Sequence, residues 1–214
     1  MPMLSAPEFL DPQTWHTQVA DGPAGALETV DYIRKLIFEG VSDFLVREES
    51  LGAIKHIPDR DTTGIIKAIH NHVQRNYRFR WDPYGREMLV NVRYILLGNR
   101  RVPGFGIDCD DFVILESCLL RAVGIPTDIV ISACDRRRPQ DYSHIYLRAF
   151  DRKTNKWVPL DPTNKRANPG WEPKSYLKKV INIDLMQPGV PAEPVPTSVS
   201  GIAYFPRHMT RGRR

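Results

Sequence analysis

Three residues whose side chains can carry out nucleophilic catalysis follow one another along the chain: Cys109, His144 and Asp161. A thiolate can attack a carbonyl carbon, an imidazole can accept the thiol proton, and a carboxylate can hold the imidazole in the required tautomer. A lone cysteine is more often a buried structural residue, which is what we expect of Cys118 and Cys134. The chemistry therefore depends on whether the fold brings the three residues together.

Cys109 follows a glycine-rich turn and precedes the apolar stretch 112–120, which predicts a helix that begins at the cysteine. The residue before it is a predicted N-cap, so the thiol lies in the first turn, where the helix dipole favours a thiolate. Negative charge that opposes the thiolate comes from Asp108, Asp110 and Asp111. We expect these carboxylates to point to water, so that contact with His144 outweighs them. For Asp110 and Asp111, stabilisation of the helix is as good an interpretation as a role in the site.

Alternating apolar residues predict three strands joined by short polar connections, which favours an antiparallel meander over 127–133, 143–150 and 157–160. If the second and third strands pair, residues near positions 147 and 160 lie opposite each other. His144 then lies beside Asp161. A helix packed on this sheet can bring Cys109 to His144.

Residues with helical periodicity come before these strands. Predicted helices cover 24–50, as one bent helix or two short ones, a stretch between Pro58 and Tyr77, and 87–98, while short strands are expected at 77–81 and 180–185. Helices followed by a small antiparallel sheet indicate the α+β class, with N-terminal helices packed on the sheet. We expect an extended N-terminal arm (1–23), a core (24–165) and a C-terminal extension (166–214) that contains a proline-rich segment (188–196) and a basic tail (207–214).

The composition is that of an ordinary soluble globular protein, with 42% hydrophobic and 26% charged residues among 214. The net charge of +5 does not by itself indicate a nucleic-acid partner, and no apolar run is long enough to span a membrane. Without a signal sequence we expect a cytoplasmic protein that keeps its thiols free. The three cysteines form no disulfide framework or zinc motif, and His70 and His72 face different ways on a helix. We expect no cofactor, metal or membrane contact, and solvated or core-edge histidines.

Four segments resemble the transglutaminase-like core, which belongs to the papain-like cysteine protease superfamily. They are Gly-Ile-Asp-Cys-Asp-Asp, Leu-Leu-Arg-Ala-Val-Gly-Ile-Pro, Ser-His-Ile-Tyr-Leu and Trp-Val-Pro-Leu-Asp-Pro-Thr. The resemblance covers about 60–165, and Arg80-Trp81-Asp82 with Glu87 is similar to short bacterial and bacteriophage members. It implies that Cys109 is the nucleophile, His144 the base and Asp161 the orienting acid. It also implies an oxyanion hole in which the cysteine N–H is joined by an upstream donor, for which the candidates are Trp81 and Asn91.

The resemblance implies an enzyme that transfers acyl groups through a Cys109 thioester. The enzyme would hydrolyse peptides or amides, which we slightly favour for a short chain, or transfer the acyl group of a protein or peptide to an amine. An alternative is a non-catalytic structural or adaptor protein on the same fold, in a larger assembly such as a bacteriophage virion, with its terminal arms as contacts. Its basic tail could then touch nucleic acid, although simple solubility is the better interpretation of the tail. A third alternative, a zinc site formed by Cys109, His144 and an aspartate, is the least favoured.

Overall fold

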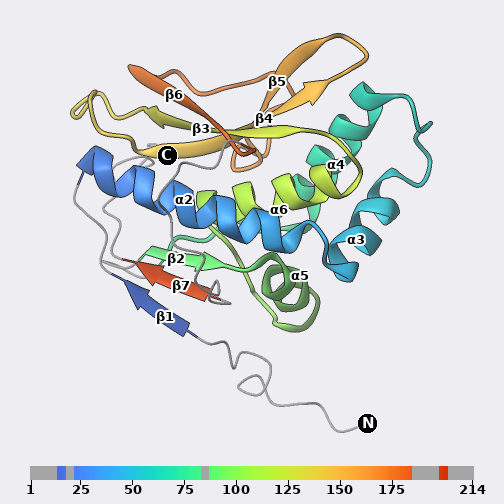
Figure 1. Ribbon diagram of the computed structural model, residues 1–214, viewed down its shortest axis with the longest axis horizontal. Coiled ribbons are helices and arrows are strands. Elements are labelled where there is room, and N and C mark those ends of the chain that lie inside the picture. The colour runs from blue at the N-terminus through green and yellow to red at the C-terminus, as the bar shows by residue number, and fades with distance from the viewer. Residues whose placement is uncertain (1–13, 18–21, 83–86, 185–197, 202–214) are drawn as a thin grey trace, which may run out of the picture.

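A computed structural model of the protein describes residues 14–17, 22–82, 87–184 and 198–201. Helices and a four-stranded antiparallel sheet pack against each other, so the predicted α+β class is confirmed (Figure 1). The helices are α2 (Gly22–Gly40), α3 (Phe44–Ile54), α4 (Thr62–Asn76), α5 (Val92–Arg101) and α6 (Cys109–Ala122), and the strands of the sheet are β3 (Thr127–Ala133), β4 (His144–Asp151), β5 (Lys156–Leu160) and β6 (Leu177–Asn182).

Helix α6 is the central element, in contact with the four other helices and with β4 (Figure 1). It is mostly apolar, and every residue from Asp110 to Leu120 is buried, as expected of a helix that other elements surround. Asp108 is its N-cap, as predicted, and accepts hydrogen bonds from the backbone N–H groups of Asp110 and Asp111. Gly124, with a φ of 79°, lies just beyond the end of the helix in the left-handed conformation.

The strand order is β5-β4-β3-β6, and all neighbouring strands are antiparallel. The predicted meander over β3, β4 and β5 is confirmed, and Leu147 of β4 lies opposite Leu160 of β5. The strand expected at 180–185 is present as β6, at 177–182. Because the chain returns to the sheet at β6, the segment between β5 and β6 must connect the two opposite edges of the sheet.

Residues 87–98 do not form the single helix that we expected. They divide into β2 (Glu87–Val90) and the beginning of α5, with Asn91 as the N-cap of that helix. β2 pairs with β7 (Ser198–Gly201), which also pairs with β1 (Thr14–Thr17). A short apolar run such as Met88–Val90 suits either kind of element, and pairing with a distant strand decides the outcome here.

The segments 24–50 and 77–81 follow the predicted pattern to different extents. The stretch 24–50 forms parts of two helices, which meet at Asp43, the N-cap of α3. The strand expected at 77–81 is reduced to one bridge between Phe79 and Ile107. The proline-rich segment, the basic tail and most of the N-terminal arm lie outside the described residues.

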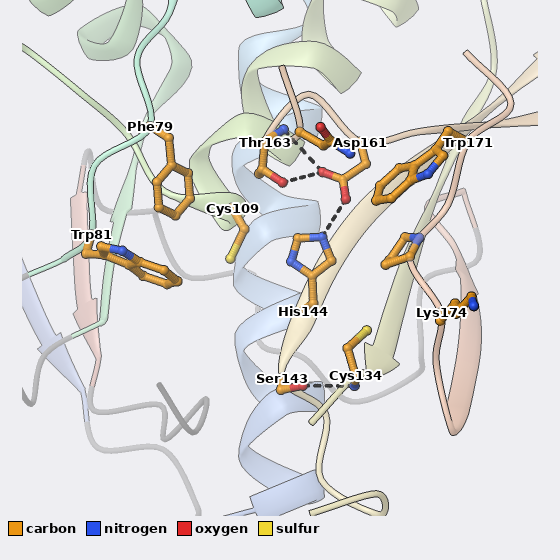
Figure 2. Close-up of a pocket in the computed structure, with 12 residues that line it drawn as sticks. Phe79, Trp81, Cys109, Cys134, Ser143, His144, Asp161, Thr163, Trp171 and Lys174 are labelled. Atoms are coloured by element: carbon orange, nitrogen blue, oxygen red, sulfur yellow. Dashed lines mark hydrogen bonds and ion pairs between the residues drawn. The ribbon is translucent and has the colours of Figure 1, made fainter. Parts of the chain in front are cut away.

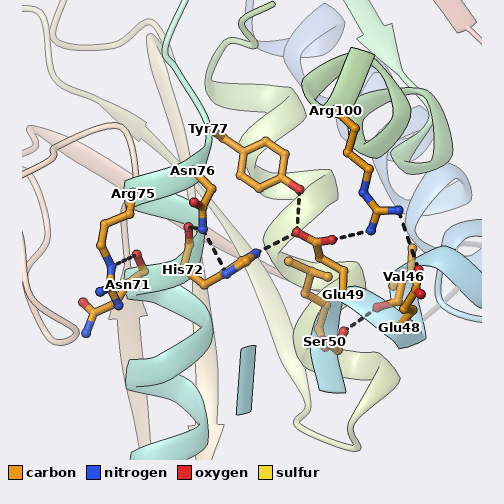
Figure 3. A network of polar contacts seen from close by, with 11 residues as sticks. Val46, Glu48, Glu49, Ser50, Asn71, His72, Arg75, Asn76, Tyr77 and Arg100 are labelled. Carbon is orange, nitrogen blue, oxygen red and sulfur yellow. Dashed lines mark hydrogen bonds and ion pairs between the residues drawn. The ribbon is translucent and has the colours of Figure 1, made fainter. Parts of the chain in front are cut away.

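A polar network joins α3, α4 and α5 (Figure 3). The Glu49 carboxylate accepts hydrogen bonds from His72 Nε2 (2.8 Å), from the Tyr77 hydroxyl (3.2 Å) and from the Arg100 guanidinium (2.6 Å). The bond from His72 is the largest influence on this carboxylate, and with Arg100 it outweighs burial, so the pKa of Glu49 falls to about 2. The network therefore stabilises the packing of three helices. None of the helices among the described residues is long and apolar enough to cross a membrane.

Candidate active site

A pocket of about 560 Å³ contains all three residues that the sequence singled out (Figure 2). Cys109 reaches it from the first turn of α6, His144 from the first position of β4, and Asp161 from the residue after β5. The described residues that line it are Phe79, Trp81, Cys109, Cys134, Ser143, His144, Asp161, Thr163, Asn164, Trp171, Pro173 and Lys174.

The His144 and Asp161 side chains form a hydrogen-bonded pair, with 2.7 Å between Nε2 and Oδ2. The other carboxylate oxygen, Oδ1, accepts hydrogen bonds from the Thr163 backbone N–H (3.2 Å) and from the Thr163 hydroxyl (2.5 Å). Burial would raise the pKa of Asp161, but the bonds from His144 and Thr163 outweigh burial and hold it below the usual 3.8. Asp161 is therefore an ionised acceptor that can keep the proton of the imidazole on Nε2.

The Cys109 sulfur and the His144 ring face each other across the pocket (Figure 2). Because Nε2 is bonded to Asp161, the ring nitrogen left for Cys109 is Nδ1. When Nε2 carries the proton, Nδ1 has a free lone pair and can accept the thiol proton. The arrangement can thus produce a thiolate and an imidazolium ion that stabilise each other.

The three aspartates around Cys109 do not point to water, contrary to our expectation. Asp108, Asp110 and Asp111 are 5%, 0% and 2% exposed. Asp111 Oδ1 accepts a hydrogen bond from the Val90 backbone N–H (2.8 Å), so this carboxylate fixes the end of β2 to the start of α6. Burial, followed by the negative neighbours, raises the pKa of Asp108 well above its usual value, and burial is also the largest cause of the raised pKa of Asp111. Since burial favours the protonated forms of Asp108 and Asp111, these two groups oppose a thiolate less than two full charges would.

Of the three aspartates, Asp110 contacts the Cys109 thiol. The Cys109 thiol lies 3.5 Å from Asp110 Oδ1, within donor range for sulfur, and Asp110 Oδ2 has no hydrogen-bond partner. Ligand atoms of Asp108, Cys109 and Asp110 lie within 4.8 Å of one another, which is the one grouping of possible metal ligands among the described residues. This grouping differs from the zinc alternative that the sequence offered, which required His144. None of the three cysteines, all of which lie in the described ranges, forms a disulfide bond.

Of the two candidate oxyanion donors, Trp81 lies at the pocket and Asn91 does not. The bridge between Phe79 and Ile107 places the segment before Trp81 next to the turn that leads into Cys109. The ring of Phe79 then packs edge-on against Trp81, at 4.7 Å between centroids. The Asn91 side chain instead accepts a hydrogen bond from the Arg93 backbone N–H (2.9 Å), so it serves as a helix cap.

A sequence profile of the transglutaminase-like superfamily matches residues 54–162, which is half of the chain. The chain belongs to the transglutaminase-like superfamily. The matched region of this transglutaminase-like protein contains Cys109, His144 and Asp161, in the order and on the elements described above.

Solved structures that this transglutaminase-like chain is similar to include a suspected protease from Parabacteroides distasonis, with 13% identity and a TM-score of 0.47 over 72% of this chain and 29% of that chain. A suspected cysteine protease from Cytophaga hutchinsonii has 14% identity and a TM-score of 0.42, over 72% of this chain and 57% of that chain. Red sea bream transglutaminase has 17% identity and a TM-score of 0.35, over 62% of this chain and 27% of that chain. The chain thus spans less than two thirds of each of these proteins. No curated protein sequence matches it.

One wall of the pocket comes from residues that the sequence did not point to. Trp171, Pro173 and Lys174 lie in the connection between β5 and β6, beyond the end of the transglutaminase-like match. This part of the chain has no periodic pattern. Its large apolar residue, Trp171, could have indicated that the segment packs against the domain. Cys134, which we expected to be buried like Cys118, is only half-buried and also lines the pocket.

The loop that carries Asp161 is held against helix α4. The Gln74 amide donates to the carbonyl oxygens of Asn164 and Ala167, both at 2.8 Å. Lys165 Nζ donates to the carbonyl oxygens of Gln74 and Tyr77 at the end of α4. These contacts hold the Asp161 loop against the end of α4, and apart from Asn164 they are made by residues that do not line the pocket.

The expectation of solvated or core-edge histidines is wrong for His70. His70 is fully buried on α4, and its Nδ1 lies 2.8 Å from Glu116 Oε1 on α6, which is also fully buried. His72 is partly buried and bonded to Glu49. A charged residue within a buried, mostly apolar helix needs a buried partner. Glu116 in the sequence could therefore have indicated a buried pair such as His70–Glu116.

Proposed function

We propose that this protein is an acyl-transfer enzyme in which Cys109 is the nucleophile, His144 the general base and acid, and Asp161 the orienting carboxylate. The observation that carries the proposal is the hydrogen-bonded His144–Asp161 pair in an open pocket, with its second ring nitrogen directed at a thiol in the first turn of a helix. Membership of the superfamily supports it. Protein or peptide segments are the proposed acyl donors.

In the first half-reaction, His144 Nδ1 accepts the Cys109 proton and the thiolate attacks the carbonyl carbon of the substrate amide. The carbon–nitrogen bond then breaks, the imidazolium gives its proton to the departing amine, and a Cys109 thioester remains. In the second half-reaction, His144 removes a proton from water or from a primary amine as that molecule attacks the thioester. The thiol leaves with the proton, and the product is an acid or a new amide.

The negative oxygen formed at each attack needs donors. The first candidate is the Cys109 backbone N–H, which lies at the positive end of the α6 dipole. The Trp81 indole N–H is the proposed second donor, because Trp81 lines the same pocket and is held by Phe79. We favour hydrolysis over transamidation because Cys109 is only half-buried, which leaves the thioester open to water.

Competitive alkylation tests the nucleophile. Iodoacetamide should label Cys109 at least about tenfold faster than Cys134 and Cys118 at neutral pH, because a thiolate is the reactive form. Burial raises the pKa of the Cys134 and Cys118 thiols, so the comparison within one protein is an internal control. Mass spectrometry of the three peptides gives the rates. Equal labelling of Cys109 and Cys134, or an unchanged Cys109 rate in His144→Gln, would contradict the proposal.

The alternative of a non-catalytic assembly protein rests on terminal segments that lie outside the described residues. It makes an opposite prediction for one variant. If Cys109→Ala leaves the cellular role of the protein intact while truncation of the terminal segments abolishes it, the alternative is right and the enzyme proposal is wrong.

A further inference from the structure

We infer that the segment 168–176, between β5 and β6, selects the substrate of the proposed enzyme, and that it selects peptide segments with an acidic residue beside a large apolar one. The inference rests on the proposed function and adds the class of acyl donor. Trp171 and Lys174 of this segment lie on the His144 side of the pocket, and Phe79 and Trp81 lie on the Cys109 side (Figure 2). Pro173 of the same segment also lines the pocket. A substrate that reaches Cys109 must therefore contact this segment.

The segment is fixed along its length, as a recognition surface must be. The Gly170 backbone N–H donates to the Pro159 carbonyl oxygen (2.8 Å), and at the far end the Tyr176 backbone N–H donates to the Ala133 carbonyl oxygen (2.8 Å). Between them, Glu172 accepts hydrogen bonds from the Tyr146 hydroxyl (2.8 Å) and from Lys178 Nζ (3.0 Å). The wall is thus tied to strands β3, β4, β5 and β6, so a bound substrate does not have to order it.

Trp171 supplies the apolar part of the recognition. Its side chain is 40% exposed beside His144 and Asp161, although an indole ring of this size is usually more buried. The second exposed tryptophan of the pocket, Trp81, lies on the opposite wall, so a peptide between them passes over the thiol. A large apolar side chain next to the scissile bond would cover the exposed face of Trp171 and remove both surfaces from water.

Lys174 supplies the charge. Among the described residues, two with full charges line the pocket, and one of them, Asp161, is already bonded to His144 and Thr163. Lys174 makes no ion pair within the described ranges, and the neighbouring carboxylate, Glu172, is bonded to Lys178 instead. The unpaired charge at the pocket is therefore positive. A substrate carboxylate beside the apolar residue is the group that complements it.

The test uses the full-length protein and a pool of amine-blocked peptides from a digested cell lysate, with a biotin-bearing primary amine present. Mass spectrometry then reads both hydrolysed and amine-transferred products. Wild-type protein should favour donors with Asp or Glu within a few residues of a large apolar residue at the reaction site. Lys174→Glu should change the ratio of acidic to basic donors by about fivefold, the size expected for an exposed charge pair. Trp171→Ala should remove the apolar preference.

Matched controls are Lys179→Glu, on exposed β6, and Trp157→Ala, on β5, neither of which lines the pocket. Both should keep the wild-type profile. Hydrolysis of p-nitrophenyl acetate and iodoacetamide labelling of Cys109 should be unchanged in the two control variants, since neither position lines the pocket. Loss of both small-reagent activities in wild-type protein would overturn the proposed function itself. Turnover of the peptide pool with a donor profile that Lys174→Glu leaves unchanged would overturn the inference alone. Hydrolysis of the ester with no turnover of the peptide pool would overturn both the inference and the proposed peptide donors.

Discussion

Two histidine–carboxylate pairs of nearly the same geometry lie in different surroundings in this molecule. His144 and Asp161 are 2.7 Å apart at the pocket, and His70 and Glu116 are 2.8 Å apart between α4 and α6. The His144 side chain is 18% exposed, whereas both members of the second pair are fully buried. A short bond between an imidazole and a carboxylate is therefore no sign of catalysis by itself. What differs is whether the other ring nitrogen meets a nucleophile.

The second pair is better explained by the needs of the core. Burial lowers the pKa of His70, but the charge and hydrogen bond of Glu116 outweigh it, so the pKa of His70 is raised above 6.5. The negative charge of Asp161 also contributes to raising the pKa of His70, so the pocket pair acts electrostatically on the buried pair. We interpret His70–Glu116 as the link that fixes α4 to the central helix, close behind the Asp161 loop.

The strongest way to break this comparison is to make the same substitution in each pair. His144→Gln should reduce turnover by about a thousandfold or more, because the thiol loses its base, while the melting temperature changes little. His70→Gln should do the reverse. It should lower the free energy of unfolding by about 3 kcal/mol, because Glu116 is left buried without its charged partner. Turnover per folded molecule should stay close to wild type.

The measurements are urea denaturation and turnover of p-nitrophenyl acetate, corrected for the folded fraction. The two variants control each other, since each removes one imidazole and adds one amide. A His70→Gln protein that is stable but inactive would show that the buried pair takes part in the reaction, and the division between the two pairs would fail.

Asp161→Asn sharpens the role of the pocket pair. Thr163 donates two hydrogen bonds to Asp161 Oδ1, so the new amide should keep its oxygen toward Thr163 and direct its NH2 group at His144 Nε2. That forces the imidazole proton onto Nδ1, and a protonated Nδ1 cannot accept the thiol proton. Turnover should fall by about a thousandfold, as a wrong tautomer requires. Adding Thr163→Val removes the hydroxyl donor, so the new amide can rotate and present its oxygen to His144. The double variant should then recover about tenfold of the lost turnover. Turnover of both variants checks this, and equal rates would contradict it.

The pocket pair could be predicted from the sequence because short-range rules determine it. The turn at 151–156 and the alternation of the flanking strands set the register, with Leu147 opposite Leu160, and His144 is then brought near Asp161. Cys109 follows from the same kind of rule, since Asp108 caps a helix whose apolar residues begin at Phe112, shortly after the thiol. Local capping and pairing thus predicted most of the candidate site.

The remainder depends on contacts between distant parts of the chain. His70 is buried because Glu116 lies on a helix that packs against α4, and neither residue shows this in its own segment. β2 exists as a strand through pairing with β7, which periodicity within 87–98 cannot reveal. Trp171 became a pocket residue because the segment that carries it connects opposite edges of the sheet. Such tertiary contacts override local propensity.

The third pair, His72–Glu49, extends the comparison to a partly buried site and predicts an acid dependence. The pKa of Glu49 is about 2 in the folded protein against 4.5 when unfolded, so its contribution to stability is full above pH 4.5 and is lost as the pH falls toward 2. Glu49→Gln should lower the free energy of unfolding by about 2 kcal/mol at pH 7 and flatten the decline between pH 4.5 and 2. Urea denaturation at several pH values measures both effects. Glu48→Gln is the control, because this exposed neighbour lies 3.6 Å from Arg100 and should contribute under about 0.5 kcal/mol. Equal pH profiles for wild type and Glu49→Gln would contradict the prediction.

Asp110 offers the smallest and most selective change. Its carboxylate lies beside the Cys109 thiol rather than beside an imidazole, so its charge opposes the ion pair that Asp161 supports. Asp110→Asn should keep the shape of the first turn and raise the rate of iodoacetamide labelling of Cys109 at pH 6 by about fivefold, because the thiolate becomes more accessible at low pH. Cys134 in the same protein is the control and should label at its wild-type rate. A slower reaction of Cys109 would mean that Asp110 helps to accept the thiol proton. Asp110 would then support the thiol–imidazole ion pair from the Cys109 side as Asp161 does from the His144 side. The contrast between the two aspartates would be wrong.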